Sequence, residues 1–97
     1  MDNYKNIMDI QTLDDGSMSI ALKNGKEAII EIVKFEEKFS AAIYCMFIPK
    51  FEQNKKKKNL LAELQKHDAY KECAREAIGW IDENQDKFVR IEEKEEF

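Results

Sequence analysis

Hydrophobic and polar residues alternate with a period of two through the first half of the chain, which is the pattern of half-buried β-strands. In the stretch SMSIALK, every second side chain from Met18 to Leu22 is apolar. The same alternation continues through residues 26–35 and 38–48, with short polar turns between the segments. The pattern predicts a four-stranded antiparallel meander that ends at Pro49, because proline cannot donate a hydrogen bond to a sheet ladder.

Two glycine turns predict the register of this sheet. Three-residue loops at Asp14-Asp15-Gly16 and Lys23-Asn24-Gly25 place a glycine third, where the chain needs a left-handed conformation. The expected cross-strand pairs are Met8–Leu22, Ile10–Ile20, Ile20–Ala28 and Met18–Ile30. Both loops therefore favour one apolar face, and a third turn near Glu36-Glu37 adds alternate residues of the fourth strand, opposite Ala28, Ile30 and Ile32.

Beyond Asn59 the apolar spacing becomes helical. Leu60, Leu61 and Leu64 predict a short helix, and a second stripe between residues 70 and 88 predicts a longer one. The two stripes are rotated by roughly 140° about a helix axis, so we expect a break near His67-Asp68. Asp68 is the expected N-cap of a long helix over about residues 69–87, packed on the apolar face of the sheet.

Length and composition favour a single domain, which the predicted strands and helices make α+β. The chain has 97 residues, of which 43% are hydrophobic and 37% charged, with a formal net charge of −4. We expect the sheet over about residues 4–48, a basic connector over 49–58, helices over 59–88 and an acidic tail over 89–97. The longest apolar run, residues 41–48, is too short to cross a membrane.

The N-terminus lacks a basic region followed by an apolar one, and Cys45 and Cys73 have no CxxC spacing. We therefore expect buried, reduced thiols and a cytoplasmic protein, without a membrane partner.

Little in the chain points to catalysis. His67 is the only histidine, and the sequence has neither a phosphate-binding glycine loop nor an HExxH motif. We predict no enzyme activity, no cofactor and no metal. Gly79 falls in the middle of the long helix, opposite its apolar stripe, so either the helix bends there or another molecule approaches closely.

The four lysines Lys55, Lys56, Lys57 and Lys58 form a basic run. A solvated loop is the preferred interpretation, because residues 68–97 carry 10 acidic and 5 basic side chains and would repel a polyanion. A contact with nucleic acid or an acidic partner is the alternative.

The reverse face of the third and fourth strands is unusually apolar for a meander, whose second face is normally polar. Its predicted partner-binding residues are Ile29, Val33, Phe35, Tyr44, Met46 and Ile48. Such a patch indicates an interaction site, unless the short helix or the tail covers it. A second predicted partner surface is an acidic helix face made by Glu72, Glu76, Asp82, Glu83 and Asp86.

These features predict a small, acidic, non-enzymatic protein-interaction module that forms a homodimer. Size and charge place it with inhibitors or adaptors of phage or mobile-element type, which act on the basic surface of a nucleic-acid-binding protein. The alternative is a single-stranded nucleic-acid-binding protein that uses the sheet and Lys55–Lys58. A meander followed by a helix resembles, in element order alone, the Whirly-type DNA binders.

Overall fold

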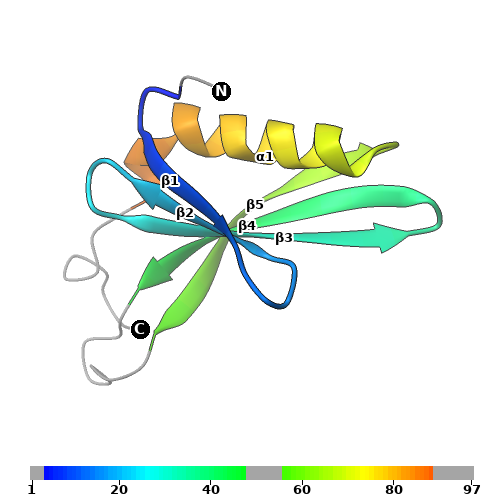
Figure 1. Cartoon of the computed structure of the whole chain (residues 1–97), viewed down its shortest axis with the longest axis horizontal. Coiled ribbons are helices and arrows are strands. Elements are labelled where there is room, and N and C mark those ends of the chain that lie inside the picture. Colours follow the sequence, from blue (N-terminus) through cyan, green and yellow to red (C-terminus); the bar gives the residue numbers. More distant parts are fainter. Residues whose placement is uncertain (1–3, 48–55, 89–97) are drawn as a thin grey trace.

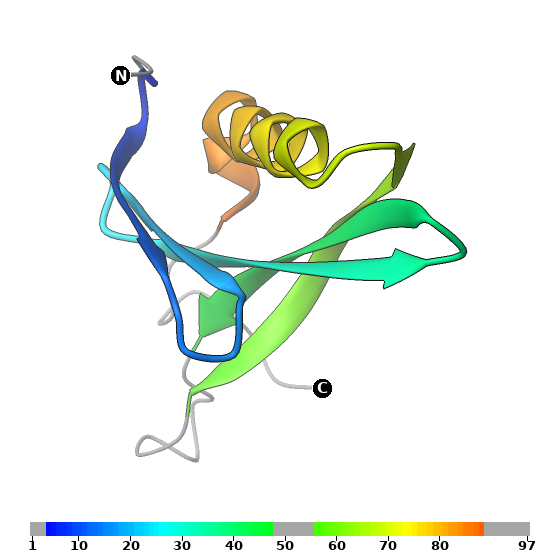
Figure 2. The same ribbon diagram turned by 45° about the vertical axis from the view of Figure 1, so that its right-hand side comes forward.

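The computed structural model describes residues 4–47 and 56–88, with residues 65 and 66 described by their backbone alone. The strands are β1 (Ile7–Thr12), β2 (Met18–Leu22), β3 (Glu27–Phe35), β4 (Lys38–Phe47) and β5 (Lys57–His67), followed by α1 (Tyr70–Glu83) and a 3₁₀ turn, η1 (Gln85–Lys87). The strands form an antiparallel sheet in the order β1-β2-β3-β4-β5. The sheet is strongly twisted, and α1 lies across one face (Figures 1 and 2). The fold is therefore α+β, as predicted, with one strand more than expected.

The two glycine turns form as the sequence predicts. Gly16 and Gly25 have φ values of 91° and 89°, and each backbone N–H closes its loop by donating to a carbonyl oxygen three residues earlier, at 3.0 Å. The predicted pairs Ile10–Ile20, Met18–Ile30 and Ile20–Ala28 are all present.

Met8 does not lie opposite Leu22, so that prediction is wrong. The ladder between β1 and β2 shifts between Ile7 and Asp9, and Ile7 pairs with Leu22 instead. The shift is a β-bulge, which adds one residue to one strand and is common at a sheet edge. As a result Ile7 is 9% exposed and packs in the core, whereas Met8 is 68% exposed.

The third hairpin has a two-residue loop, Glu36-Glu37, and both residues have positive φ, 52° and 68°. Positive φ at both central positions marks a type I′ turn, whose twist matches that of the flanking strands. The loop fixes the pairs Ala28–Cys45, Ile30–Ile43 and Ile32–Ala41, as the sequence predicts.

The predicted short helix at Leu60–Leu64 is instead part of β5. This strand runs antiparallel to β4, with Leu60 opposite Tyr44 and Leu64 opposite Ala41. Lys57 and Lys58 belong to the same strand, so they are not in a loop. Without β5, the ten residues of β4 would present a long unpaired edge, and pairing satisfies its backbone groups.

Helix α1 closes the core on the inner face of the sheet. Its residues Cys73, Ala77 and Ile81 are fully buried, in one cluster with the sheet residues Ile30 and Ile43. Phe88 is also fully buried and meets Trp80 edge to face, with ring centroids 6.2 Å apart.

The predicted N-cap is wrong by one residue. Ala69 is the N-cap and makes no side-chain capping hydrogen bond. The Asp68 carboxylate instead pairs with the Lys38 ammonium, which lowers the pKa of Asp68 below its ordinary value.

Candidate protein-interaction surface

The face of the sheet turned away from α1, here called the outer face, carries the alternate side chains of β3, β4 and β5. Because Ile30 and Ile43 point into the core, their neighbours Ile29 and Tyr44 point outward, as predicted. The outer face of these three strands comprises Glu27, Ile29, Glu31, Val33, Phe35, Ser40, Ala42, Tyr44, Met46, Lys58, Leu60 and Glu63.

Exposure of the predicted apolar patch is uneven. Ile29 is only 8% exposed, and Tyr44 and Met46 are half-buried. Val33 and Phe35 are each 62% exposed. These two residues lie toward the tip of the β3–β4 hairpin, which reaches past the end of α1 (Figure 1). The accessible part of the predicted patch is thus the hairpin end, while Leu60 of β5, on the same outer face, is 48% exposed. Ile48 lies outside the described residues.

The lysine run contributes to this face rather than to a separate basic patch. Lys58 Nζ lies 4.5 Å from the centroid of the Tyr44 ring, and its ammonium pairs with the Glu31 carboxylate. This carboxylate raises the pKa of Lys58. Lys56 Nζ lies 2.9 Å from Glu27 Oε1. Two of the four lysines are therefore neutralised by carboxylates of β3, while Lys55 lies outside the described residues.

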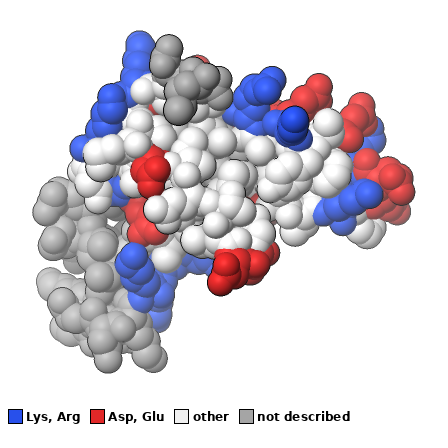
Figure 3. Space-filling view, in the orientation of Figure 1, with Lys and Arg blue, Asp and Glu red and all other residues white. Residues whose placement is uncertain are grey.

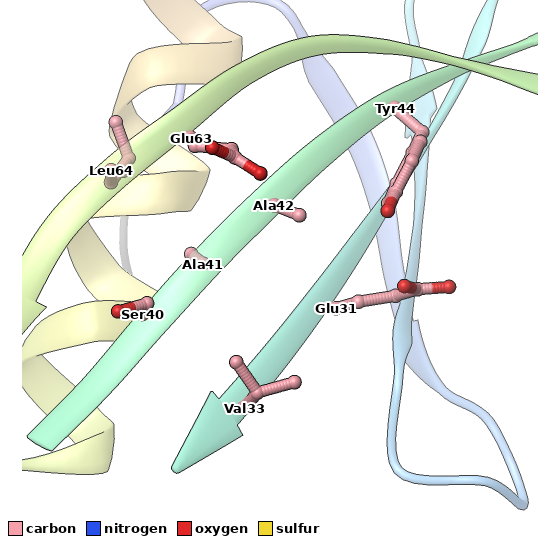
Figure 4. Close-up of a pocket in the computed structure, with 8 residues that line it drawn as sticks. All are labelled: Glu31, Val33, Ser40, Ala41, Ala42, Tyr44, Glu63 and Leu64. Carbon is pink, nitrogen blue, oxygen red and sulfur yellow. The ribbon is translucent and has the colours of Figure 1, made fainter. Parts of the chain in front are cut away.

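An open hollow of about 480 Å³ lies beside Tyr44 on the outer face (Figure 4). It is lined by Glu31, Val33, Ser40, Ala41, Ala42, Tyr44, Glu63 and Leu64. The hollow exists because the small side chains of Ser40 and Ala42 alternate along β4 before the large Tyr44.

Two carboxylates border this hollow in one row across the sheet. Ala42 pairs with Glu31 of β3 on one side and with Glu63 of β5 on the other. The Glu63 side chain points toward Ala42 in Figure 4. Within the described part of the chain Glu63 has no ion-pair partner, whereas Glu31 is paired with Lys58. One carboxylate of the row is thus neutralised and the other is not.

The outer half of β3 also presents a strand edge. The pairing of β2 with β3 ends at Met18–Ile30, and no described strand pairs with the same edge of β3 beyond that point. A second hollow, of about 400 Å³, lies there between the β1–β2 loop and β3, lined in part by Asp15, Glu31 and Val33. The edge is left open because β2 has five residues and β3 has nine, so β2 is too short to pair with the outer half of β3.

Two residues of the predicted acidic helix face make contacts within the chain. Asp82 accepts hydrogen bonds from the backbone N–H groups of Lys5 and Asn6, at 3.3 and 2.7 Å. Glu76 Oε1 lies 2.5 Å from His67 Nε2. Glu72, Glu76, Glu83 and Asp86 are exposed. For all five residues of this face the predicted contact with a partner stays a prediction.

The described residues contain no group of three or more His, Cys, Asp or Glu side chains that could hold a metal ion. Cys45 and Cys73 are buried thiols, and burial raises the pKa of Cys73.

In the described part of the chain, α1 is neither long nor apolar enough to cross a membrane. In Figure 3, Lys and Arg lie mainly round the margin of the molecule, and uncharged surface fills much of the middle.

Comparisons of the chain with protein-family models, with curated proteins and with solved structures found no match.

Proposed function

We propose that this protein is a small, non-enzymatic protein-interaction module that binds another protein chain through the hairpin end of its outer face. The observation that supports this most directly is the exposure of Val33 and Phe35, 62% each, beside an open hollow. Complete burial of such a side chain contributes roughly 1.5–3 kcal/mol. Two of them together provide a useful apolar centre for an interface.

The adjoining edge of β3 supports the same proposal. Strand edges with unpaired backbone groups bind extended segments of other chains by adding a strand to the sheet. Here the edge and the exposed Val33 belong to the same half of β3, so one partner can use both. A second copy of this chain is the simplest partner, and a basic surface of a different protein is the other form of the proposal.

The test compares the wild-type protein with Val33→Lys and Phe35→Lys. We expect each substitution to weaken self-association, or binding to a purified partner, by about tenfold or more, because a charge at the centre of an apolar contact is desolvated. Mass is measured by light scattering over a range of protein concentrations. Met8→Lys is the matched control, since Met8 is slightly more accessible, at 68% against 62%, but lies on β1. Equal behaviour of all three variants would contradict the proposal.

Single-stranded nucleic-acid binding is the second candidate function. It is favoured by the placement of Tyr44 beside Lys58 on an open sheet, since an aromatic ring and a cation together can hold a stacked base. Against it, Glu27 and Glu31 neutralise Lys56 and Lys58 and oppose a phosphate backbone. Oligonucleotide binding that falls steeply with salt, and is lost on replacing Lys55–Lys58 with alanine, would support this function. An absence of binding at low salt would exclude it.

A further inference from the structure

We propose that the hollow around Ala42 binds a cationic side chain, lysine or arginine, that projects from a basic surface of a partner protein. The inference rests on the form of the proposed function in which the partner is a basic surface of a different protein, and it specifies which side chain of that surface binds.

The walls and floor of the hollow match a side chain that has an apolar stem and a charged head. Ala42 and Val33 offer apolar surface for the stem, and Ser40 leaves room beside them. Glu63 offers a carboxylate without an ion-pair partner in the described part of the chain, and the Tyr44 ring stands on the same face. A cationic group near the Glu63 carboxylate gains charge-assisted hydrogen bonding. The cation–π contact with the Tyr44 ring is already made by Lys58.

The chain itself shows that this part of the sheet accepts an ammonium group. Lys58 reaches across β4, lies 4.5 Å from the Tyr44 ring centroid and pairs with Glu31. The aliphatic part of the Lys58 side chain therefore lies along the outer face, as we propose for the cationic side chain of the partner. Lys58 satisfies Glu31 and leaves Glu63, on the other side of Ala42, for a second cation.

Charge complementarity decides between classes of occupant. The whole chain carries a formal charge of −4, and within it the row across the hollow holds two carboxylates, Glu31 and Glu63, and one lysine, Lys58. A phosphate or another anion would be repelled there. The exposed apolar residues Val33 and Phe35 lie next to the hollow, so a protein that carries the cation can also cover them.

The experiment uses the full chain and a short blocked peptide with two arginines, together with the same peptide containing neutral citrulline. We expect the arginine peptide to shift the amide NMR signals of Ser40, Ala42 and Glu63 at low ionic strength, and the citrulline peptide to leave them in place. Glu63→Gln should weaken binding of the arginine peptide by about fivefold to tenfold, as expected for loss of a charge-assisted contact. Lys58→Met should strengthen it, because Glu31 and the Tyr44 ring then become available to the peptide.

Asp9→Asn is the matched control, since it changes the net charge by the same amount as Glu63→Gln but lies on β1, three strands from β4. It should leave the affinity nearly unchanged. Trp80 fluorescence confirms that each variant is folded, because Trp80 packs against the buried Phe88.

Three results would overturn the inference. The first is no binding of the arginine peptide, the second is equal weakening by Asp9→Asn and Glu63→Gln, and the third is a set of NMR shifts confined to α1. None of these results decides the effect of Phe35→Lys on association, because Phe35 does not line the hollow. The proposed function is therefore tested separately, by the association measurements on Val33→Lys and Phe35→Lys.

Discussion

Asn6 and Asp82, 76 residues apart in the sequence, bind each other through two hydrogen bonds of 2.7 Å. The Asn6 backbone N–H donates to Asp82 Oδ1, and the Asn6 side-chain amide donates to the Asp82 carbonyl oxygen. Gln85 Nε2 donates to Asn6 Oδ1 at 3.0 Å. These contacts tie the segment before β1 to the C-terminal end of α1 and the turn that follows it.

Asp82→Ala is expected to lower the free energy of unfolding by about 1–3 kcal/mol, because it leaves a partly buried N–H group of Asn6 without its acceptor. Urea denaturation followed by Trp80 fluorescence measures the change. Glu83→Ala is the control, since Glu83 is the exposed neighbour, and it should change stability by no more than about 0.5 kcal/mol. Similar losses for both variants would show that the contact with Asn6 is unimportant.

Gly79→Ala should stabilise the protein by about 1 kcal/mol, since alanine is the better helix former. A Cβ atom added at Gly79 would have no atom within 4 Å, so no steric cost opposes the gain. Gly25→Ala, at φ of +89°, should do the opposite and cost roughly 1–2 kcal/mol. Thermal and urea unfolding of the two variants test both signs. If Gly79→Ala is stabilising but weakens association, the glycine serves close approach of another molecule.

Both residues of the Glu36-Glu37 loop have positive φ, which is unfavourable for glutamate because its Cβ atom crowds the backbone. Replacing the pair with Asn-Gly, the preferred sequence of a type I′ turn, should raise the free energy of unfolding by about 1–2 kcal/mol. Replacing both residues with glutamine removes the charges but keeps the strain, and it should change stability little. The exposed Lys34–Glu37 pair, at 3.9 Å, contributes little to either comparison. A glutamine variant as stable as the Asn-Gly variant would assign the cost to charge instead.

The Asp15 carboxyl group makes part of the folding stability depend on pH in the acid range. Its carboxylate accepts hydrogen bonds from the Ser17 hydroxyl at 2.6 Å and the Ser17 backbone N–H at 2.9 Å. The hydroxyl contact first, and then the backbone contact, lower the pKa of Asp15. A carboxyl with a lower pKa in the folded state contributes stability above its unfolded pKa of about 3.9, and this contribution is lost as pH falls through the folded value.

Ser17→Ala should therefore move the pKa of Asp15 upward, toward its ordinary value, in an NMR titration of the carboxyl group. The stability difference between wild type and Ser17→Ala should be full at neutral pH and should shrink as the pH falls below about 4. In an Asp15→Asn background this pH-dependent part should disappear. A pKa of Asp15 that does not respond to Ser17→Ala would contradict the assigned cause.

Much of the sheet could be predicted because its turns are local. Gly16 and Gly25 fix two loops, and each loop determines which residues of the adjoining strands face each other. The bulge at Ile7–Asp9 could not be predicted in the same way, because either Ile7 or Met8 could fill the core. The contacts of Asn6 with the distant Asp82 accompany the choice of Ile7, and no pattern within β1 specifies them.

The error at β5 has a different cause. Leu60, Leu61 and Leu64 have the spacing of a short amphipathic helix, and leucine, alanine, glutamate and lysine all favour helices. The edge of β4 lies far away in the sequence, and its demand for hydrogen-bond partners outweighs this modest local preference. A bulge near Leu61 then separates the leucines, with Leu60 on the outer face and Leu64 toward the core. The hollow follows from this placement, since it requires Glu63 beside Ala42.

The α+β class, the register from β2 to β4 and the presence of the long helix follow from the amino-acid sequence alone, because turn glycines and apolar periodicity act over a few residues. Three features depend on contacts between distant parts of the chain: residues 57–67 form a fifth strand, Lys58 lies over Tyr44, and Asp82 binds Asn6. Those arrangements depend on which distant backbone and charged groups remain without partners once the local elements have formed. The residues of a single strand or helix do not specify these distant partners.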